Sequence, residues 1–188
     1  MPIRIAIFAS GSGSNAENII KYFSQSDTLF FPLIISNKPD AYVHRRAENL
    51  KIPSLTFTRE EFSEGSQVIQ SLKLYKIDCI VLAGFLLKIP ACVVKAFPDK
   101  IINIHPALLP KYGGKGMYGD KVHQAVVDAH DKETGITIHY VNENYDEGNI
   151  IFQAKCSVLP TDTPEMVALK VHALEYEYYP KIIEKIWG

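Results

Sequence analysis

The sequence has almost no net charge, no long apolar run and few cysteines. Its 20 basic side chains are matched by 21 acidic ones, so the basic excess typical of a nucleic-acid surface is absent and we expect small-molecule ligands. No apolar run is long enough to span a bilayer, and we expect neither a membrane partner nor a signal peptide. The cysteines, Cys79, Cys92 and Cys156, are scattered and odd in number, and two lie in apolar runs. This pattern is typical of reduced core thiols, so we expect a cytoplasmic protein.

Strand-like and helical segments alternate over the first hundred residues. Apolar, β-branched-rich runs occur at 3–9, 29–35, 55–57, 78–83 and 100–104. The segments between them fit helices, including a long stretch at 59–75 and a short one at 91–96. At 188 residues the chain fits one domain with a sizeable core. We therefore predict a single Rossmann-like α/β domain over 1–188, with a mostly parallel central sheet covered on both faces.

The pattern changes after residue 104. Residues 105–119 contain two prolines and four glycines without any periodicity, which favours a functional loop. A helix at 120–129 and strands at 136–141 and 150–158 follow, and Thr163-Pro164-Glu165 then suits the start of a terminal helix. The glycines at 113–119 permit either a lid that orders when substrate binds or a merely flexible surface loop.

A glycine loop at 11–15 lies between the first strand and the first helix. Its sequence, Gly-Ser-Gly-Ser-Asn, places free backbone N–H groups at a helix N-terminus, where a phosphate is favoured. The third glycine of a dinucleotide fingerprint is missing, as is the Gly-Lys-Ser/Thr of a nucleoside-triphosphate loop. We interpret the loop as a phosphate site, the alternative being a tight turn that needs small residues.

Asn103 and His105 end a buried strand, where open α/β sheets bind their ligands. Residues two apart in a strand point the same way, so the amide and the imidazole can address one substrate atom. The amide can donate to an oxyanion and the imidazole can exchange protons, as acyl transfer requires. Asp146, in a polar turn between two strands, would orient His105 and raise its basicity if the two lie together. Otherwise Asp146 is a solvated turn residue.

The histidines outside this strand are expected to be structural. This applies to His123, His130 and His139, because a lone histidine is more often a satisfied structural group than a catalytic one. We assign mobility, not chemistry, to the loop before His123. Any role for Lys115 or His123 is left open.

Four blocks of the sequence resemble the phosphoribosylglycinamide formyltransferase family, and the resemblance runs from end to end. They are Ser-Gly-Ser-Gly-Ser-Asn at 10–15, Leu-Ala-Gly-Phe at 82–85, Asn-Ile-His-Pro-Ala-Leu-Leu-Pro-Lys-Tyr at 103–112, and 135–151. The resemblance implies attack of the amine of glycinamide ribonucleotide on the formyl carbon of 10-formyltetrahydrofolate. A tetrahedral intermediate would then yield formylglycinamide ribonucleotide and tetrahydrofolate in purine biosynthesis, without a metal.

The resemblance also implies roles for individual residues. Asn103 would stabilise the oxyanion, His105 would act in proton transfer, and Asp146 would tune His105 and relay protons through water. The substrate, bound by its phosphate and ribose, would contact Gly11, Ser12, Gly13, Ser14, Asn15, His172 and Glu175. The folate would contact Leu86, Leu87, Lys88, Ile89, Asn103, Asn142, Glu143, Asn144, Tyr145 and Asp146.

The same resemblance divides the domain into a phosphate-binding half at 1–100 and a catalytic and folate-binding half at 101–188. Family members often carry an arginine after Ala-Gly-Phe, where this chain has Leu86-Leu87-Lys88. Backbone contacts to folate would survive that difference, and the role of Lys88 is left open. Both a monomer and a homodimer are compatible with the sequence.

Other functions remain possible at this stage. A formyltransferase acting on methionyl-tRNA would be expected to carry a C-terminal RNA-binding domain, and one acting on an amino sugar would share the same three catalytic residues. A hydrolase of 10-formyltetrahydrofolate would usually carry a regulatory domain in front. An inactive phosphate-binding module would use only 11–15 and would have a broken catalytic set, whereas Asn103, His105 and Asp146 are all present.

Overall fold

A seven-stranded sheet forms the centre of the protein. The computed structural model describes all 188 residues. The strands are β1 (Ile3–Phe8), β2 (Leu29–Ser36), β3 (Ser54–Thr56), β4 (Cys79–Leu82), β5 (Ile101–His105), β6 (Glu133–Tyr140) and β7 (Ile150–Ser157). Their order is β3-β2-β1-β4-β5-β6-β7. The first five strands pair in parallel, whereas β6 is antiparallel to both β5 and β7. The predicted single α/β domain with a mostly parallel sheet is therefore confirmed.

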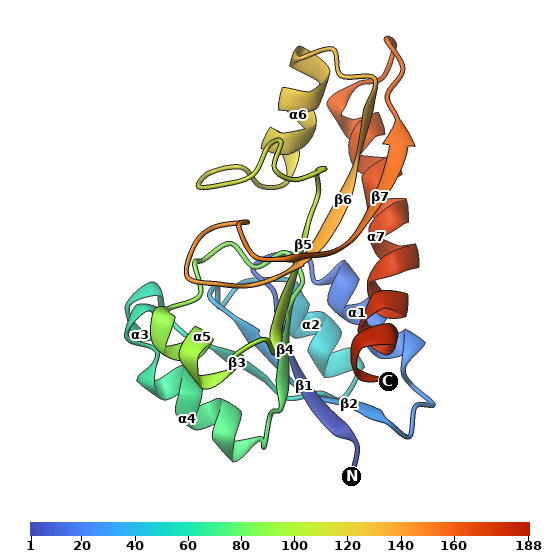
Figure 1. Cartoon of the computed structure of the whole chain (residues 1–188). Coiled ribbons are helices and arrows are strands. Elements are labelled where there is room, and N and C mark those ends of the chain that lie inside the picture. The colour runs from blue at the N-terminus through green and yellow to red at the C-terminus, as the bar shows by residue number, and fades with distance from the viewer.

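Seven helices cover the sheet, as Figure 1 shows. They are α1 (Ser14–Tyr22), α2 (Val43–Asn49), α3 (Arg59–Glu64), α4 (Ser66–Leu74), α5 (Ala91–Ala96), α6 (Asp120–Asp128) and α7 (Pro164–Trp187). One core cluster joins the sheet to α1, α2, α6 and α7, and a second joins its other face to α3, α4 and α5. Both faces are covered, as parallel sheets require.

Strand alternation divides the core between these two faces. In β1, Ile5 and Ile7 belong to the first cluster, whereas Ala6 and Phe8 belong to the second, and all four are fully buried. Side chains of a strand alternate between the faces of a sheet, so an uninterrupted apolar run supplies both cores. The near-continuous hydrophobicity of 3–9 reflects this double burial.

The structure differs from the sequence prediction at two places. The long helix expected at 59–75 is two helices, because Gly65 has a φ of 72° and ends α3 before α4 begins. A left-handed residue cannot continue an α-helix. Cys92 is exposed, not buried in a core, because the short helix α5 lies at the surface and turns only Val93 fully inward.

The long terminal helix α7 begins as predicted. The side chain of Thr163 accepts a hydrogen bond from the backbone N–H of Met166 at 3.3 Å, and Pro164 occupies the first turn. The helix then runs along the side of the sheet and packs against both α1 and α6. Its middle section thus joins the phosphate-loop region to α6.

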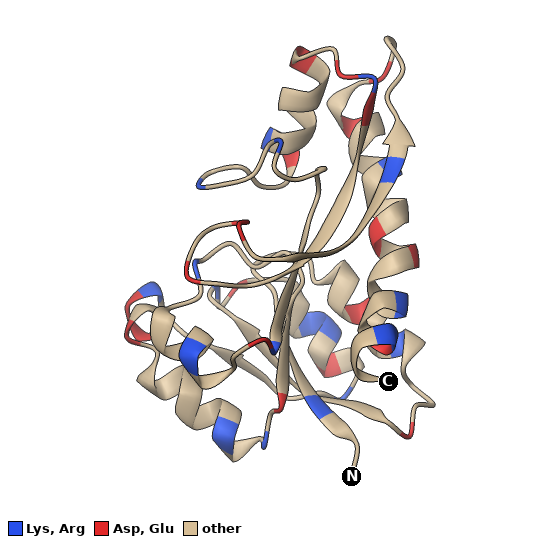
Figure 2. Ribbon diagram, viewed as in Figure 1, with Lys and Arg blue, Asp and Glu red and all other residues tan.

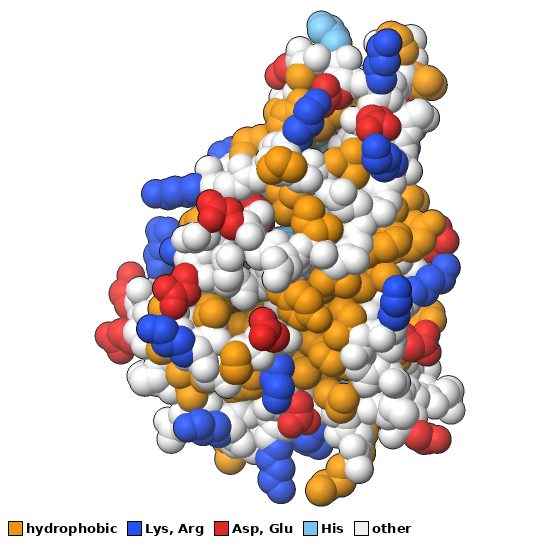
Figure 3. All heavy atoms as spheres, viewed as in Figure 1, with side chains coloured by type: hydrophobic (Ala, Val, Ile, Leu, Met, Phe, Trp, Pro, Cys, Tyr) orange, Lys and Arg blue, Asp and Glu red, His pale blue; other side chains and the backbone are white.

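The surface carries charges of both signs. Figure 2 shows Lys and Arg interspersed with Asp and Glu over the whole ribbon. Figure 3 shows hydrophobic side chains over the middle of one face, bordered by charged groups. None of the helices combines the length and the apolar character needed to cross a membrane.

Candidate active site

The carboxyl ends of β1, β4 and β5 meet at one edge of the sheet. The chain leaves β1 toward β2 on one side and reaches β4 on the other, so the strand order reverses between β1 and β4. Ligands of open α/β sheets bind at such a reversal. Ser10 joins the segments that follow β1 and β4. Its N–H donates to the carbonyl of Gly84 at 3.0 Å, and its Oγ accepts from the N–H of Leu86 at 2.9 Å.

The glycine loop delivers an uncapped helix N-terminus to this edge. Gly13 precedes α1 with a φ of 73° and provides no side-chain cap. A Cβ at Gly13 would overlap Val43, so both the backbone angle and the space require glycine. The first-turn N–H groups of α1 are therefore free, and they carry the positive end of the helix dipole. This geometry fits a phosphate at the predicted residues Gly11 to Asn15.

Asn15 links this loop to α7. Its Nδ2 donates to Glu175 Oε2 at 2.8 Å, and the same oxygen lies 2.9 Å from Nδ1 of His172. The hydrogen bond with Glu175 raises the pKa of His172 above its ordinary value, which favours an imidazolium paired with the carboxylate. The structure thus brings three predicted substrate-binding residues into one polar group, in which Asn15 and Glu175 are buried and His172 is half exposed.

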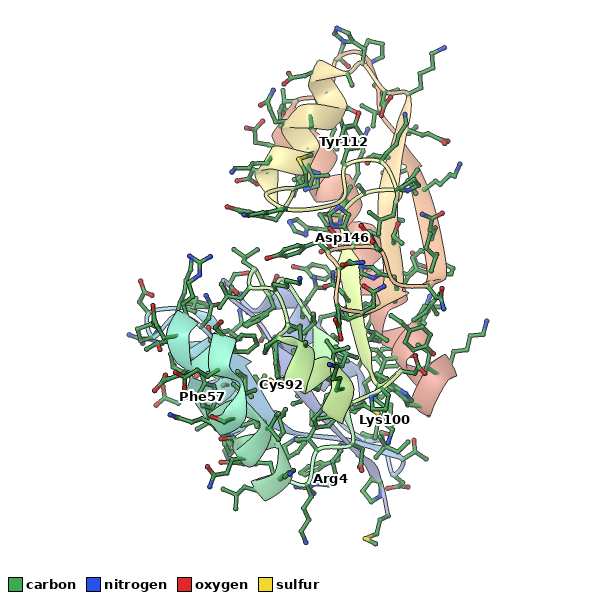
Figure 4. The ribbon with its side chains drawn as sticks, turned by 60° about the vertical axis from the view of Figure 1, so that its left-hand side comes forward. Arg4, Phe57, Cys92, Lys100, Tyr112 and Asp146 are labelled. Atoms are coloured by element: carbon green, nitrogen blue, oxygen red, sulfur yellow. The ribbon has the colours of Figure 1, made fainter.

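His105 is held at the end of β5 by contacts at both ring nitrogens. Its Nε2 lies 2.7 Å from the carbonyl oxygen of Tyr112, and its Nδ1 lies 3.6 Å from Oδ2 of Asp146. A carbonyl only accepts hydrogen bonds, so Nε2 carries the proton and Nδ1 is the free base of the neutral ring. Figure 4 labels Asp146 and Tyr112, which come from the segments after β6 and β5.

Asp146 is fixed by a turn and by three partners. Its φ is 54°, and its Oδ2 accepts the N–H of Gly114 at 2.9 Å while its Oδ1 lies 3.6 Å from Nε2 of His139. Burial alone would raise the pKa of Asp146. The rings of His139 and His105, which favour the carboxylate when they are protonated, and the Gly114 N–H together outweigh burial, so the pKa is lowered and the group is a carboxylate.

Burial dominates the titration of His105. Only 4% of the residue is exposed, and this desolvation lowers its pKa below the ordinary histidine value. The charge of Asp146 and the Tyr112 carbonyl act in the opposite direction. Asp146 thus acts on His105 in the expected direction, toward a higher pKa, but burial outweighs it. A buried imidazole stays neutral at neutral pH and is ready to accept a proton.

Asn103 and His139 face one another across the β5–β6 pair. They are register partners, and Nδ2 of Asn103 lies 3.2 Å from Nε2 of His139. The Nδ1–H of His139 donates to the carbonyl of Tyr140 at 2.8 Å, so Nε2 accepts from the Asn103 amide. This contact orients the amide and leaves its second N–H free.

The segments predicted to hold folate meet at a cavity of about 400 Å³. Its walls include Leu87, Lys88 and Ile89 from one predicted segment and Glu143 and Tyr145 from the other. The ammonium of Lys88 lies 5.8 Å from the ring centre of Tyr145. Helix α3 adds Arg59, Phe62 and Ser63 to the wall, which the sequence did not indicate. Leu86, Asn142 and Asn144 are outside the lining.

Sequence reasoning missed three contributors to the site. They are His139, the carbonyl of Tyr112 and the N–H of Gly114. Antiparallel pairing of the strand at 133–140 with the one ending at His105 would have placed His139 opposite Asn103. The two backbone groups leave no signal in the sequence. No group of three or more His, Cys, Asp or Glu side chains is arranged to hold a metal ion.

Comparison with known proteins gives one consistent family. The formyl transferase model matches residues 3–183. Phosphoribosylglycinamide formyltransferase of Haemophilus influenzae is 38% identical over 96% of this chain and 85% of its own length. The chloroplastic enzyme of that name from Arabidopsis thaliana is 41% identical over 97% of this chain, which spans 65% of that relative.

Solved structures agree with this result. Glycinamide ribonucleotide transformylase 1 of Geobacillus kaustophilus superposes with a TM-score of 0.91 at 32% identity, covering 100% of both chains. Phosphoribosylglycinamide formyltransferase of Coxiella burnetii superposes with a TM-score of 0.89 at 35% identity, covering 100% of this chain and 88% of its own. The chain therefore belongs to the formyl transferase family, and it is similar over nearly its whole length to the phosphoribosylglycinamide formyltransferases within it.

Proposed function

We propose that this enzyme transfers a formyl group from 10-formyltetrahydrofolate to the amine of glycinamide ribonucleotide. The observation that carries the proposal is the meeting of Asn103, His105 and Asp146 at the edge of the sheet that also carries the uncapped N-terminus of α1. An oxyanion donor, a neutral base and a carboxylate that stabilises the protonated base are the groups an acyl transfer uses. The names of the relatives supply the ribonucleotide and the formyl transfer, and the folate donor follows from the family resemblance of the sequence.

The ribonucleotide binds along the line from α1 to α7. Its phosphate accepts the free N–H groups of the loop at 11–15, and its ribose contacts His172 and Glu175. Glu175 already accepts hydrogen bonds from both Asn15 and His172. Anchoring the two ends of the substrate in this way directs its amine toward the end of β5 and converts the reaction into one between held groups.

The formyl donor enters from the opposite side of β5. Its apolar ring system lies against 86–89 and 142–146, of which Leu87, Lys88, Ile89, Glu143 and Tyr145 line the cavity of about 400 Å³. Ligand sites of this kind combine apolar walls with a few fixed polar groups. Asn103, at the end of β5, contacts the formyl oxygen of the folate in this arrangement.

The chemistry follows from these positions. The amine nitrogen forms a bond to the formyl carbon, and the carbonyl oxygen becomes an oxyanion that accepts the free N–H of Asn103. Nδ1 of His105 takes the proton released by the amine, and Asp146 stabilises the resulting imidazolium. The bond from the carbon to folate N10 then breaks, and the proton passes through water to N10. No step requires a metal.

The two halves of the domain divide this work unequally. Residues 1–100 provide the phosphate loop, and residues 101–188 provide Asn103, His105 and Asp146. Glu175 and the folate cavity cross this division, because Glu175 bonds Asn15 and the cavity takes residues from both halves. We therefore propose that both substrates bind between the halves.

The experiment measures tetrahydrofolate formation from 10-formyltetrahydrofolate with and without glycinamide ribonucleotide. Turnover that requires the ribonucleotide, with one formylated product per tetrahydrofolate, supports the transferase. Turnover that proceeds equally without it would identify a hydrolase instead. An amino sugar phosphate offered in its place tests the substrate class directly.

A further inference from the structure

The polar group around Glu175 contains more hydrogen-bond acceptors than donors. The carboxylate of Glu175 accepts hydrogen bonds from Asn15 and His172, both on Oε2, and Oε1 accepts none within the protein. Oδ1 of Asn15 is buried without a partner. Each residue of this hydrogen-bonded pair therefore keeps one acceptor oxygen without a protein donor, although Glu175 is only 5% and Asn15 only 9% exposed.

His123 adds a second buried atom without a partner. It lies on α6, is 2% exposed, and its Nδ1 is buried without a hydrogen-bond partner. Its ring centre is 6.4 Å from that of His172, in an edge-to-face arrangement. Only four buried side-chain atoms of the protein lack a partner, and the group formed by Asn15, His123, His172 and Glu175 contains two of them.

The protonation states make His123 an acceptor. Burial lowers the pKa of His123, and the neighbouring His172 acts in the same direction, while the carboxylates of Glu175 and Asp120 oppose both. The net result is a neutral imidazole, which always presents one nitrogen lone pair. His172, whose pKa is raised, is the donor to Glu175. The donors of the group, Asn15 Nδ2 and His172 Nδ1, are both used by Oε2 of Glu175, so the remaining acceptors on α1, α6 and α7 have no donor within the group.

A ligand that carries hydroxyl donors matches this arrangement. Unsatisfied buried acceptors are unfavourable, and native proteins keep few of them without a reason. A phosphate brings further acceptors and is unsuited, whereas each hydroxyl of a ribose can donate one hydrogen bond. His172 is half exposed, so the group opens to solvent beside it.

We propose that His123 is a further substrate-binding residue, whose Nδ1 accepts a hydrogen bond from a ribose hydroxyl of the ribonucleotide next to the carboxylate of Glu175. The inference rests on the proposed function for the identity of the ribonucleotide. It assigns a binding role to α6, which follows the glycine-rich loop at 113–119. It also replaces the expectation that His123 is only structural.

The test is a thermodynamic cycle that combines a change of His123 in the protein with removal of a ribose hydroxyl from the ligand. Calorimetry measures the dissociation constants of glycinamide ribonucleotide and of its 2′-deoxy and 3′-deoxy analogues, without folate, for the native enzyme and for His123→Leu. Loss of one neutral hydrogen bond weakens binding about 10-fold. We expect His123→Leu to weaken binding of glycinamide ribonucleotide by that factor. The affinity for the analogue that lacks the hydroxyl bound by His123 should be unchanged.

Matched variants separate binding from folding. Gln124→Leu changes the adjacent, exposed position of α6 and should bind all three ligands normally. The thermal midpoint is recorded for each variant, and His123→Gln takes the place of His123→Leu in the same cycle if the leucine variant does not fold. Equal weakening of all three ligands, or none, would overturn the role of His123. Coupled binding without any turnover would leave that role intact and contradict the proposed function.

Discussion

The backbone carbonyl of Tyr112 lies 2.7 Å from Nε2 of His105, and this contact selects the tautomer of the histidine. The side chain of Tyr112 is itself anchored, because its hydroxyl donates to Asp131 at 2.9 Å. Residue 112 has a φ of 56°, so the chain turns sharply here before Gly113. The first residues of the glycine-rich loop therefore belong to the active site, although the loop has no regular structure.

The pH profile tests the state of His105. Burial lowers the pKa of His105, so the ring is protonated only at a pH below the ordinary pKa of histidine. The ring is therefore neutral, and able to act as a base, at neutral pH. We expect kcat/KM to be flat near pH 7 and 8 and to fall in the acid range. Asp146→Asn removes a charge that favours the protonated ring, which should move the acid limb to lower pH and reduce the plateau. A limb that moves to higher pH would contradict this assignment.

His139 is expected to position Asn103. His139→Phe keeps the ring volume at a site that is 2% exposed but removes the acceptor for the Asn103 amide. One lost hydrogen bond corresponds to a reduction in kcat of about 10-fold, with KM for both substrates little changed. His139→Gln retains an acceptor and should recover part of the rate. Steady-state kinetics measures both variants. Equal kcat values for His139→Phe and His139→Gln would exclude a positioning role for His139.

Gly13 should tolerate no side chain. Gly13→Ala combines a positive φ with an overlap against Val43, so we expect a loss of more than about 1 kcal/mol in the free energy of unfolding. Gly11→Ala adds a Cβ that meets no atom within 4 Å and should stay within about 0.5 kcal/mol of the native protein. Urea denaturation measures both. Equal stabilities would show that the loop does not need its left-handed turn.

The start of α7 gives a second test of stability. Thr163→Ala removes the side chain that accepts from the Met166 N–H, and loss of such a cap costs about 1 kcal/mol. Thr161→Ala is the control, since this residue is exposed and makes no side-chain hydrogen bond. We expect the urea midpoint of Thr163→Ala to be lower than that of Thr161→Ala. Equal midpoints would show that water replaces the cap without a loss of stability.

The parallel part of the fold could be predicted because its signals are local. Continuous apolar runs identify doubly covered strands, and the breaks at 11–15 and after His105 identify the ends of β1 and β5. The reversed direction of β6 could not be predicted, because 106–119 has no periodicity and its length allows either direction. His139 reaches Asn103 only through that antiparallel register.

Only part of the candidate site could be predicted, because some of its contacts are local in sequence and others form only in the folded chain. Asn103 and His105 could be paired from strand alternation alone. Asp146 depends on a turn with a φ of 54° and on the N–H of Gly114, which only the folded chain brings together. The net titration of His105 depends on its burial, and the sequence contained no measure of that.

The most direct measurement of the catalytic assignment compares turnover and binding for Asn103→Ala. The account predicts that kcat falls about 100- to 1,000-fold, as when one oxyanion donor is removed. Calorimetric binding of glycinamide ribonucleotide should be unchanged, because its contacts lie on α1, α6 and α7. Unchanged turnover in a variant that binds the ribonucleotide normally would contradict the assignment of the active site to the end of β5.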